Sequence, residues 1–149
     1  MQVAIEQARA GIASGQSPFG AVVVRGGREL AAGHNEVWKR GDITAHAEIV
    51  AIQRACEALG SIDLSGCAMY TTSEPCPMCA SAIHWARLEL CVYGAAISDA
   101  AAAGFHELRV PARELYRIGG SEVALVEGVQ ARECAALFAE WLRAGGRGY

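Results

Sequence analysis

The sequence has neither a long apolar segment nor an excess of basic residues. No stretch near its start combines a charged beginning with an apolar run, and no uninterrupted apolar segment is long enough to cross a bilayer. We therefore expect a cytoplasmic protein without membrane contact. The formal net charge of −3 removes the broad electrostatic attraction on which most nucleic-acid binding rests. A small uncharged or anionic partner is favoured over RNA.

Internal repeats, low-complexity linkers and a disulfide framework are also missing. A chain of 149 residues with 52% hydrophobic content fits one domain, residues 1–149, with a sizeable buried core. Six cysteines are present, but nothing indicates secretion, so we expect all of them to be reduced. Only Cys76 and Cys79 are spaced as a pair. The other four stand singly in apolar or helical contexts, where a free cysteine usually behaves as a small buried hydrophobe.

Apolar periodicity and turn residues predict alternating strands and helices. The first half of the chain should form a helix at 2–14, two strands at 21–24 and 30–33 joined by a glycine turn, a polar connection at 38–42, and a helix capped by Thr44 and ended by Gly60. The second half should form strands at 68–71, 88–94 and 122–126 and helices at 77–87 and 131–142. A loop at 95–111 and a helical turn at 113–117 should lie between the last two strands. The alternation after residue 66 indicates βαβ units and at least partly parallel pairing.

Two short motifs carry the residues suited to metal chemistry. Cys76 and Cys79 are three apart, so they share one face of the first turn if a helix begins at Pro77. A helix N-terminus favours thiolate over thiol, and thiolate is the form that binds metal. His46, also at an expected helix start, supplies a third ligand. One neutral and two anionic ligands together neutralise Zn²⁺.

The number of metal ligands separates a structural from a catalytic site. A closed structural site needs a fourth donor, for which Cys67, Cys91 and His84 are candidates, but core packing explains each of them and none forms a second pair. An open site leaves the fourth position for water, which zinc acidifies toward neutral pH. Glu48 then supplies the base. His46 and Glu48 project differently from a helix, so they share a site only if substrate approaches the helix end.

The combination His-x-Glu and Pro-Cys-x-x-Cys is typical of zinc deaminases. The chain resembles the cytidine-deaminase superfamily over essentially its whole length, in the branch of purine-type and tRNA adenosine deaminases, with bacterial guanine deaminases as its nearest match. The stretches that carry the resemblance are residues 17–22, 44–48, 55–56, 74–79, 82–83, 85–87 and 99–105. The resemblance implies an α/β protein with three α/β/α layers, a mixed five-stranded sheet and helices on both faces.

The same resemblance assigns the catalytic metal site. It implies that His46, Cys76 and Cys79 bind Zn²⁺ and that Glu48 carries protons. Guanine deaminases have paired aspartates after Gly-Phe, one of which assists proton transfer, whereas this chain has His106-Glu107. Glu107 keeps a carboxylate that is one methylene longer, so it is the candidate for this catalytic role: either the role survives with a different reach, or the substrate differs.

The resemblance also suggests substrate contacts and assembly. Asn35 would hydrogen-bond the base, assisted by the Ala47 backbone, while Phe19 and Trp85 would line the pocket. Tyr149 would close it, in a homodimer whose subunits could exchange C-terminal segments. From the residues alone, Asn35 could instead finish the hairpin, Trp85 could be core and Tyr149 could fray.

Three classes of function remain. The first is a hydrolase that deaminates a free purine-type base, guanine in the first place, with a nucleoside, cytosine or a triazine as other substrates. The second is a tRNA adenosine deaminase, which should carry basic surface near its C-terminal helix. The third is a non-enzymatic zinc module that binds a partner. Glu48 argues against the third, because a structural zinc site needs no proton carrier.

Overall fold

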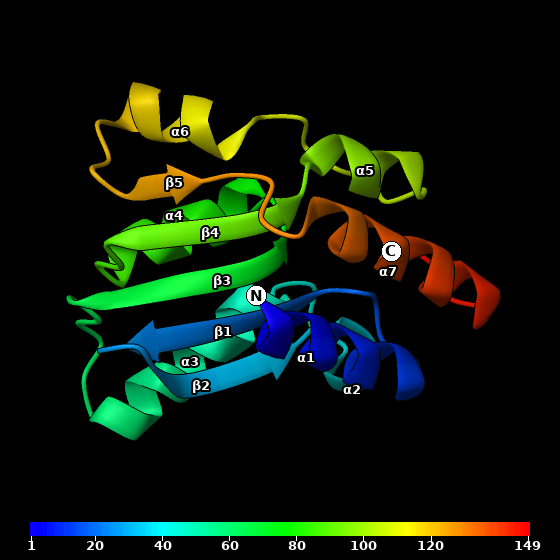
Figure 1. Cartoon of the computed structure of the whole chain (residues 1–149), viewed down its shortest axis with the longest axis horizontal. Helices are drawn as coiled ribbons and strands as arrows, with labels where there is room; N and C mark the ends of the chain where they lie inside the picture. The colour runs from blue at the N-terminus through cyan, green and yellow to red at the C-terminus, as the bar shows by residue number, and fades with distance from the viewer.

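A mixed sheet of five strands lies at the centre of the protein, and the computed structural model describes all 149 residues (Figure 1). The strands lie in the order β2-β1-β3-β4-β5. Their bounds are β1 (Gly20–Arg25), β2 (Arg28–His34), β3 (Cys67–Ser73), β4 (Leu90–Ala95) and β5 (Ala124–Val126). β1 pairs antiparallel with β2 and β3, whereas β4 pairs parallel with β3 and β5. The expected mixed sheet with parallel pairing in its second half is confirmed.

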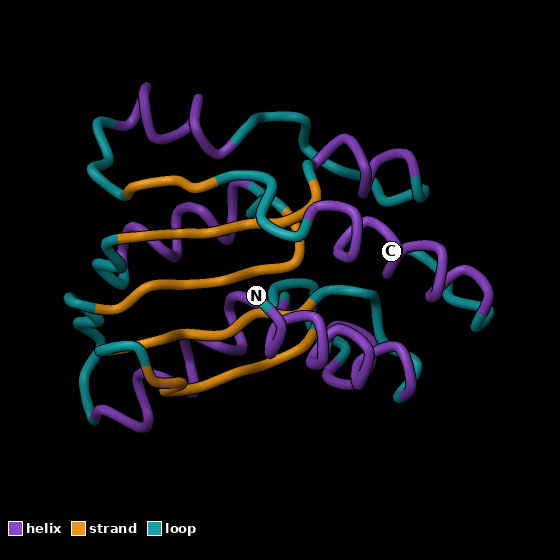
Figure 2. The backbone as a smooth tube through the Cα atoms, viewed as in Figure 1, coloured by secondary structure: helices purple, strands orange, loops and turns teal.

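Helices cover both faces of the sheet (Figure 2). Their bounds are α1 (Gln2–Ala13), α2 (Val37–Arg40), α3 (Ala47–Leu59), α4 (Pro77–Trp85), α5 (Ile97–Ala102), α6 (Ala112–Gly119) and α7 (Ala131–Arg143). α1 and α7 pack on one face, and α3 and α4 pack on the other. The three-layer α/β/α architecture is therefore confirmed. None of the helices has both the length and the apolarity needed to cross a bilayer.

The β1–β2 hairpin shows how the sequence sets its own geometry. Gly26 and Gly27 have φ values of 57° and 74°, and a two-residue hairpin turn with positive φ at both positions matches the twist of the flanking strands. At the other end of the hairpin, a Cβ on Gly33 would lie 2.7 Å from Val50 of α3. The glycine allows α3 to approach β2 closely, and α3 begins at the metal site.

Two hydrophobic clusters join the layers. One packs alanines and Ile83 of α3 and α4 against the central strands, and the other packs α1 and α7 against β4. Phe105 belongs to the second cluster, where it stacks on Trp141 with ring centroids 4.8 Å apart and meets Phe19 edge-on at 4.9 Å. This anchors the long segment after β4. None of the six cysteines forms a disulfide.

The polar connection expected at 38–42 is partly wrong, because residues 37–40 form the single turn α2. Glu36 precedes it and is only 2% exposed. Its carboxylate accepts hydrogen bonds from Lys39, Arg40 and Arg54. Contacts at i+3 and i+4 favour a helical turn, and the bond to Arg54 ties that turn to α3.

Two further expectations need correction. Thr44 does not cap α3: its amide and hydroxyl both donate to the Asp42 carboxylate, at 2.8 and 2.7 Å, and His46 is the N-cap. The loop expected at 95–111 contains α5. Its first turn is stabilised by Asp99, whose carboxylate accepts the Ala96 amide at 2.9 Å. A local side-chain to backbone bond decides the structure at both places.

Candidate metal centre and active site

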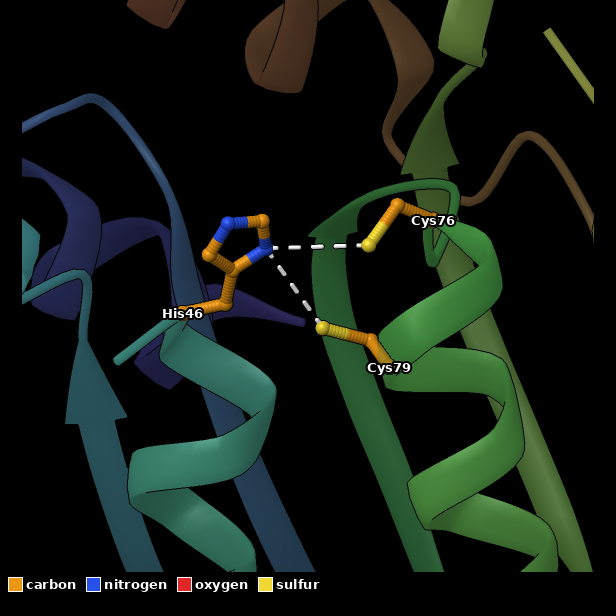
Figure 3. A group of neighbouring side chains, drawn as sticks. All are labelled: His46, Cys76 and Cys79. Atoms are coloured by element: carbon orange, nitrogen blue, oxygen red, sulfur yellow. Dashed lines mark hydrogen bonds between the residues drawn. The ribbon is translucent and has the colours of Figure 1, made fainter. Parts of the chain in front are cut away.

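His46, Cys76 and Cys79 meet where α3 and α4 begin side by side (Figure 3). His46 Nδ1 lies 3.7 Å from Cys76 Sγ and 3.6 Å from Cys79 Sγ. The three ligand atoms all lie within 4.8 Å of one another, and no other histidine, cysteine or acidic side chain belongs to the group. The group consists of the three ligands expected from the sequence, positioned to bind a metal ion.

The spacing of these atoms fits zinc. Tetrahedral coordination with Zn–N near 2.0–2.1 Å and Zn–S near 2.3 Å requires N···S separations of about 3.6 Å. Both observed separations match that value within about 0.1 Å. Two thiolates and one neutral imidazole are also a donor set that zinc prefers. The distances from the histidine to both sulfurs and the chemistry of the three donors therefore suit Zn²⁺.

Local structure explains why the ligands converge. Cys76 is the N-cap of α4, with extended φ and ψ of −63° and 166°, and Pro77 occupies the first helical turn as expected. Cys79 is one turn further along, so its sulfur returns to the side of the cap. His46 occupies the same N-cap position in α3. The first residues of α3 and α4 therefore place their ligand atoms at the same site.

The protonation of the cysteine pair favours metal binding. A hydrogen bond from Cys79, followed by the bond with His46, lowers the pKa of Cys76 to about 4 despite its burial. Burial and the neighbouring Cys76 raise the pKa of Cys79 well above its usual range. Burial alone lowers the pKa of His46, but its bond with Cys76 and the charge of Glu48 reverse the direction, and the net pKa is raised. The metal-free site already stabilises one thiolate.

Glu48 lies beside the ligands in a small cavity of about 20 Å³. The cavity walls come from Phe19, His46, Glu48, Ser73, Glu74, Cys76 and Glu107. A space of this size can hold one water molecule. Glu48 is 6% exposed, and burial raises its pKa to about 7. A carboxylate with that pKa can both accept and return a proton near neutral pH, as the sequence analysis requires of it.

A larger cavity of about 300 Å³ opens from the metal ligands to the surface. It is lined by Ile43, His46, Cys76, Pro77, Met78, Phe105, His106, Glu107, Leu108 and Tyr149. Glu107 lines both this cavity and the small one, and burial raises its pKa. The structure therefore brings the two acidic groups of the sequence analysis, Glu48 and Glu107, to the same small cavity from distant parts of the chain.

Tyr149 closes one side of the larger cavity within its own chain. Asn35 Nδ2 donates to the Tyr149 hydroxyl at 2.8 Å, while Asn35 Oδ1 accepts the Val37 amide at 3.1 Å. The hydroxyl also lies 3.3 Å from His46 Nε2. When Nδ1 of a histidine binds a metal, its Nε2 carries the proton and donates to such a partner, which fixes the ring. Tyr149 thus links the expected base-binding amide to a metal ligand.

The other residues expected in the pocket differ in where the structure places them. Phe19 lines the small cavity, whereas Ala47, the fully buried first residue of α3, lines neither cavity. Trp85 lines neither cavity of this chain and is 79% exposed. The expectation that it lines the pocket is corrected, because six residues of helix carry it about 9 Å along the axis from Cys79.

Contacts that hold the C-terminal segment have no counterpart among the features expected from the sequence. The Arg147 guanidinium lies 4.4 Å from the centre of the Trp38 ring, and Trp38 meets Tyr149 edge-on at 6.2 Å. Met78 and Leu108, which line the larger cavity, were also not singled out. Their only signal was proximity to Cys79 and Glu107 in the chain.

Comparison with known proteins gives consistent matches. The family model for the cytidine and deoxycytidylate deaminase zinc-binding region matches residues 1–95. A guanine deaminase of Bacillus subtilis is 49% identical over 105 residues, which are 70% of this chain and 65% of that protein. The chain thus spans slightly less than two thirds of that relative. A tRNA-specific adenosine deaminase of the same organism is 34% identical over 143 residues, or 96% of this chain and 86% of that protein.

Solved structures match the fold as well. A protein crystallised with 2,6-diaminopurine superposes with a TM-score of 0.90 at 32% identity, covering 99% of this chain and 82% of that one. The agreement includes the part of the chain beyond the family model.

Proposed function

The chain belongs to the cytidine and deoxycytidylate deaminase family, and from this premise we propose that it hydrolyses the amino group of a free purine-type base, with guanine converted to xanthine and ammonia. The observation that supports it most directly is the open three-ligand site with Glu48 beside it in a cavity for one water. A partner-binding zinc module has no use for that arrangement.

Zinc bound by His46, Cys76 and Cys79 would supply a water of lowered pKa. In the proposed reaction, Glu48 would accept a proton from the attacking water while the water oxygen forms a bond to the carbon that carries the amino group. Glu48 then returns the proton to the substrate, so that the carbon–nitrogen bond breaks and ammonia leaves. Glu107, at the edge of both cavities, is assigned the second proton transfer: it would donate a proton to the ring nitrogen beside that carbon and take back the remaining proton of the water as the carbonyl forms.

A free base is favoured over a nucleic acid by the shape of the site. The cavity of about 300 Å³ is at the lower end of the range for small-molecule pockets. Tyr149 lies across it and is tied to Asn35 and His46. Asn35 is fully buried behind Tyr149 and lines neither cavity, so its amide would contact a base only where the base displaces the Tyr149 hydroxyl. The protein solved with 2,6-diaminopurine, a free base, has the same fold.

A tRNA adenosine deaminase is the second candidate, because the relative of that name aligns with 96% of this chain and the guanine deaminase with 70%. Such an enzyme should carry basic surface near its last helix. α7 holds two arginines and two glutamates, Arg132, Glu133, Glu140 and Arg143, and Glu140 is paired with Arg9 at 3.0 Å. This balance favours the small substrate.

A homodimer is part of the proposal. Trp85, left exposed at the end of α4, lines a groove with Leu115 and Gly119 of α6, which suits burial against a second subunit. Tyr149 reaches the site of its own chain, so exchange of C-terminal segments is not needed to bring it there. Sedimentation of the zinc-loaded protein should give the dimer mass, and an active monomer would refute this part.

A screen of ammonia release tests the substrate. Zinc-loaded protein is incubated with guanine, guanosine, adenine, cytosine, a triazine and a tRNA anticodon stem-loop. We expect guanine to give the highest kcat/KM and the stem-loop to be inert. Deamination of the stem-loop with inert guanine would replace the first candidate by the second. Ammonia from none of them, with zinc bound, would support the non-enzymatic module.

A further inference from the structure

Glu74 is a buried carboxylate that no step of the proposed reaction uses. It follows β3, precedes Cys76 by two residues and is 8% exposed. It forms no ion pair, and both of its oxygens accept backbone N–H groups instead. Ile97 N–H donates to Oε2 at 3.1 Å, and Ala112 N–H donates to Oε1 at 3.0 Å. A carboxylate in this environment depends on such bonds to offset its desolvation.

The two donors stand at the starts of two helices. Ile97 is the first residue of α5, and Ala112 is the first residue of α6. The N–H groups of a first helical turn have no partner within the helix, and the helix dipole favours a negative charge there. One carboxylate therefore satisfies an amide at each end of the segment 97–112. It ties that segment to the chain just before the cysteine ligands.

Glu107 lies within this segment and has no side-chain partner that could orient it. Its carboxylate makes no hydrogen bond or ion pair within the protein, and its own amide donates only to the nearby Phe105 carbonyl, at 3.0 Å. Phe105 is packed against Phe19 and Trp141. The backbone, rather than a contact of its side chain, decides where Glu107 lies. Whatever fixes the ends of the segment therefore affects the reach of this carboxylate to the cavities.

We propose that Glu74 is a positioning residue, which holds the segment 97–112 at both ends and thereby places Glu107 beside the metal ligands. This rests on the role assigned to Glu107 in the proposed function. A purely stabilising role for Glu74 makes a different prediction, because its loss would then lower activity whether or not residue 107 is a glutamate.

A double-mutant cycle separates the two roles. Glu74→Gln keeps the shape of the side chain but replaces one acceptor oxygen by a donor, so it breaks one of the two bonds. In the zinc-loaded protein we expect kcat for guanine to fall by about ten- to hundredfold, because small displacements of catalytic groups have effects of this size. KM should change less than kcat, since Asn35 and Tyr149 lie outside the segment, which supplies only part of the cavity wall. In a Glu107→Gln background, Glu74→Gln should lower kcat by less than about twofold.

Hydrogen exchange gives a readout that does not depend on catalysis. We expect the amides of 97–112 to exchange at least about tenfold faster in Glu74→Gln, with the remaining chain unchanged. Glu89→Gln is the matched control, because Glu89 is an exposed carboxylate that accepts the Gly66 amide at 2.9 Å. It should leave both kcat and exchange in 97–112 at wild-type values. Glu74→Asp, which retains the charge, replaces Glu74→Gln if the latter does not fold or loses zinc.

The outcomes are distinct. A loss of kcat that is equal in both backgrounds, or unchanged exchange in 97–112, would overturn the positioning role. A loss confined to the background with Glu107, accompanied by faster exchange, would support it. If the wild-type protein deaminates no base, the proposed function fails, and the exchange measurement still decides whether Glu74 holds the segment.

Discussion

Replacing Glu48 by glutamine should remove most of the activity and at the same time stabilise the metal-free protein. Burial raises the pKa of Glu48 from 4.5 to about 7, which means that the folded protein disfavours its charged form. A shift of this size corresponds to roughly 3 kcal/mol. Glutamine resembles the neutral carboxylic acid and lacks this cost. The burial of Glu48 is therefore expected to lower the free energy of unfolding, although the same burial gives the carboxylate the pKa that a proton carrier needs.

The pH dependence follows from the direction of the shift. Because the pKa of Glu48 is higher in the folded state, its contribution to stability is fully present below about pH 4.5 and is lost as the pH rises through about 7. Glu48→Gln and the wild type should therefore have similar unfolding free energies near pH 4.5. Above pH 7 the variant should gain up to roughly 3 kcal/mol.

Urea unfolding at pH 5 and pH 8, with chelator and reductant, measures the stability difference. Ammonia release by the zinc-loaded Glu48→Gln variant measures the loss of activity. Its kcat should fall by about 10²- to 10⁴-fold while zinc is retained. Glu57→Gln, an exposed position on the same helix, is the control for both assays. Equal unfolding free energies at pH 8 would refute the cost of burial. Activity within twofold of wild type would refute the proton carrier.

Three further expectations follow from the structure. Cys79→Ala removes one of three ligands and should reduce bound zinc from about one per chain to nearly none, as measured by plasma mass spectrometry; full zinc content would exclude the proposed ligand set. Tyr149→Phe deletes the hydroxyl that lies between Asn35 and His46. It should lower kcat/KM for guanine about five- to tenfold, which corresponds to one lost hydrogen bond. An unchanged kcat/KM would show that Tyr149 does not belong to the site. Glu36→Ala leaves three cationic side chains without the buried carboxylate that they share. It should lower the free energy of unfolding by about 1–3 kcal/mol, which is less than for a fully buried ion pair because the cations are partly exposed. An unchanged free energy of unfolding in urea would contradict this expectation.

The tertiary structure explains why substrate choice is harder to infer than reaction type. Each metal-binding motif is local: a cysteine pair one turn apart, and a histidine two residues before a glutamate. The proposed base-binding site combines Asn35, Tyr149 and the segment 97–112, which are distant in the chain. The guanine deaminase relative aligns with only 70% of this chain, so the similarity carries no information about the substrate contacts of the unaligned 30%.

The sequence alone determined the strands, the longer helices and the residues of the metal site, but it missed the short helices α2 and α5. Apolar periodicity predicted the five strands and the long helices, and the spacing of Cys76 and Cys79 after a strand placed both thiols at a helix start. Such inferences succeed because strand alternation, helix starts and the reach of a helical turn depend on neighbouring residues.

Only the tertiary structure decided which distant side chains meet. It turned Trp85 outward, because a helix carries each residue a fixed distance along and around its axis. It brought Tyr149 onto His46 and connected Glu74 to both ends of 97–112. These contacts arise from the packing of helices against a shared sheet, which no local pattern encodes. The chemistry of the site is therefore local in the sequence, whereas its substrate pocket is a property of the whole fold.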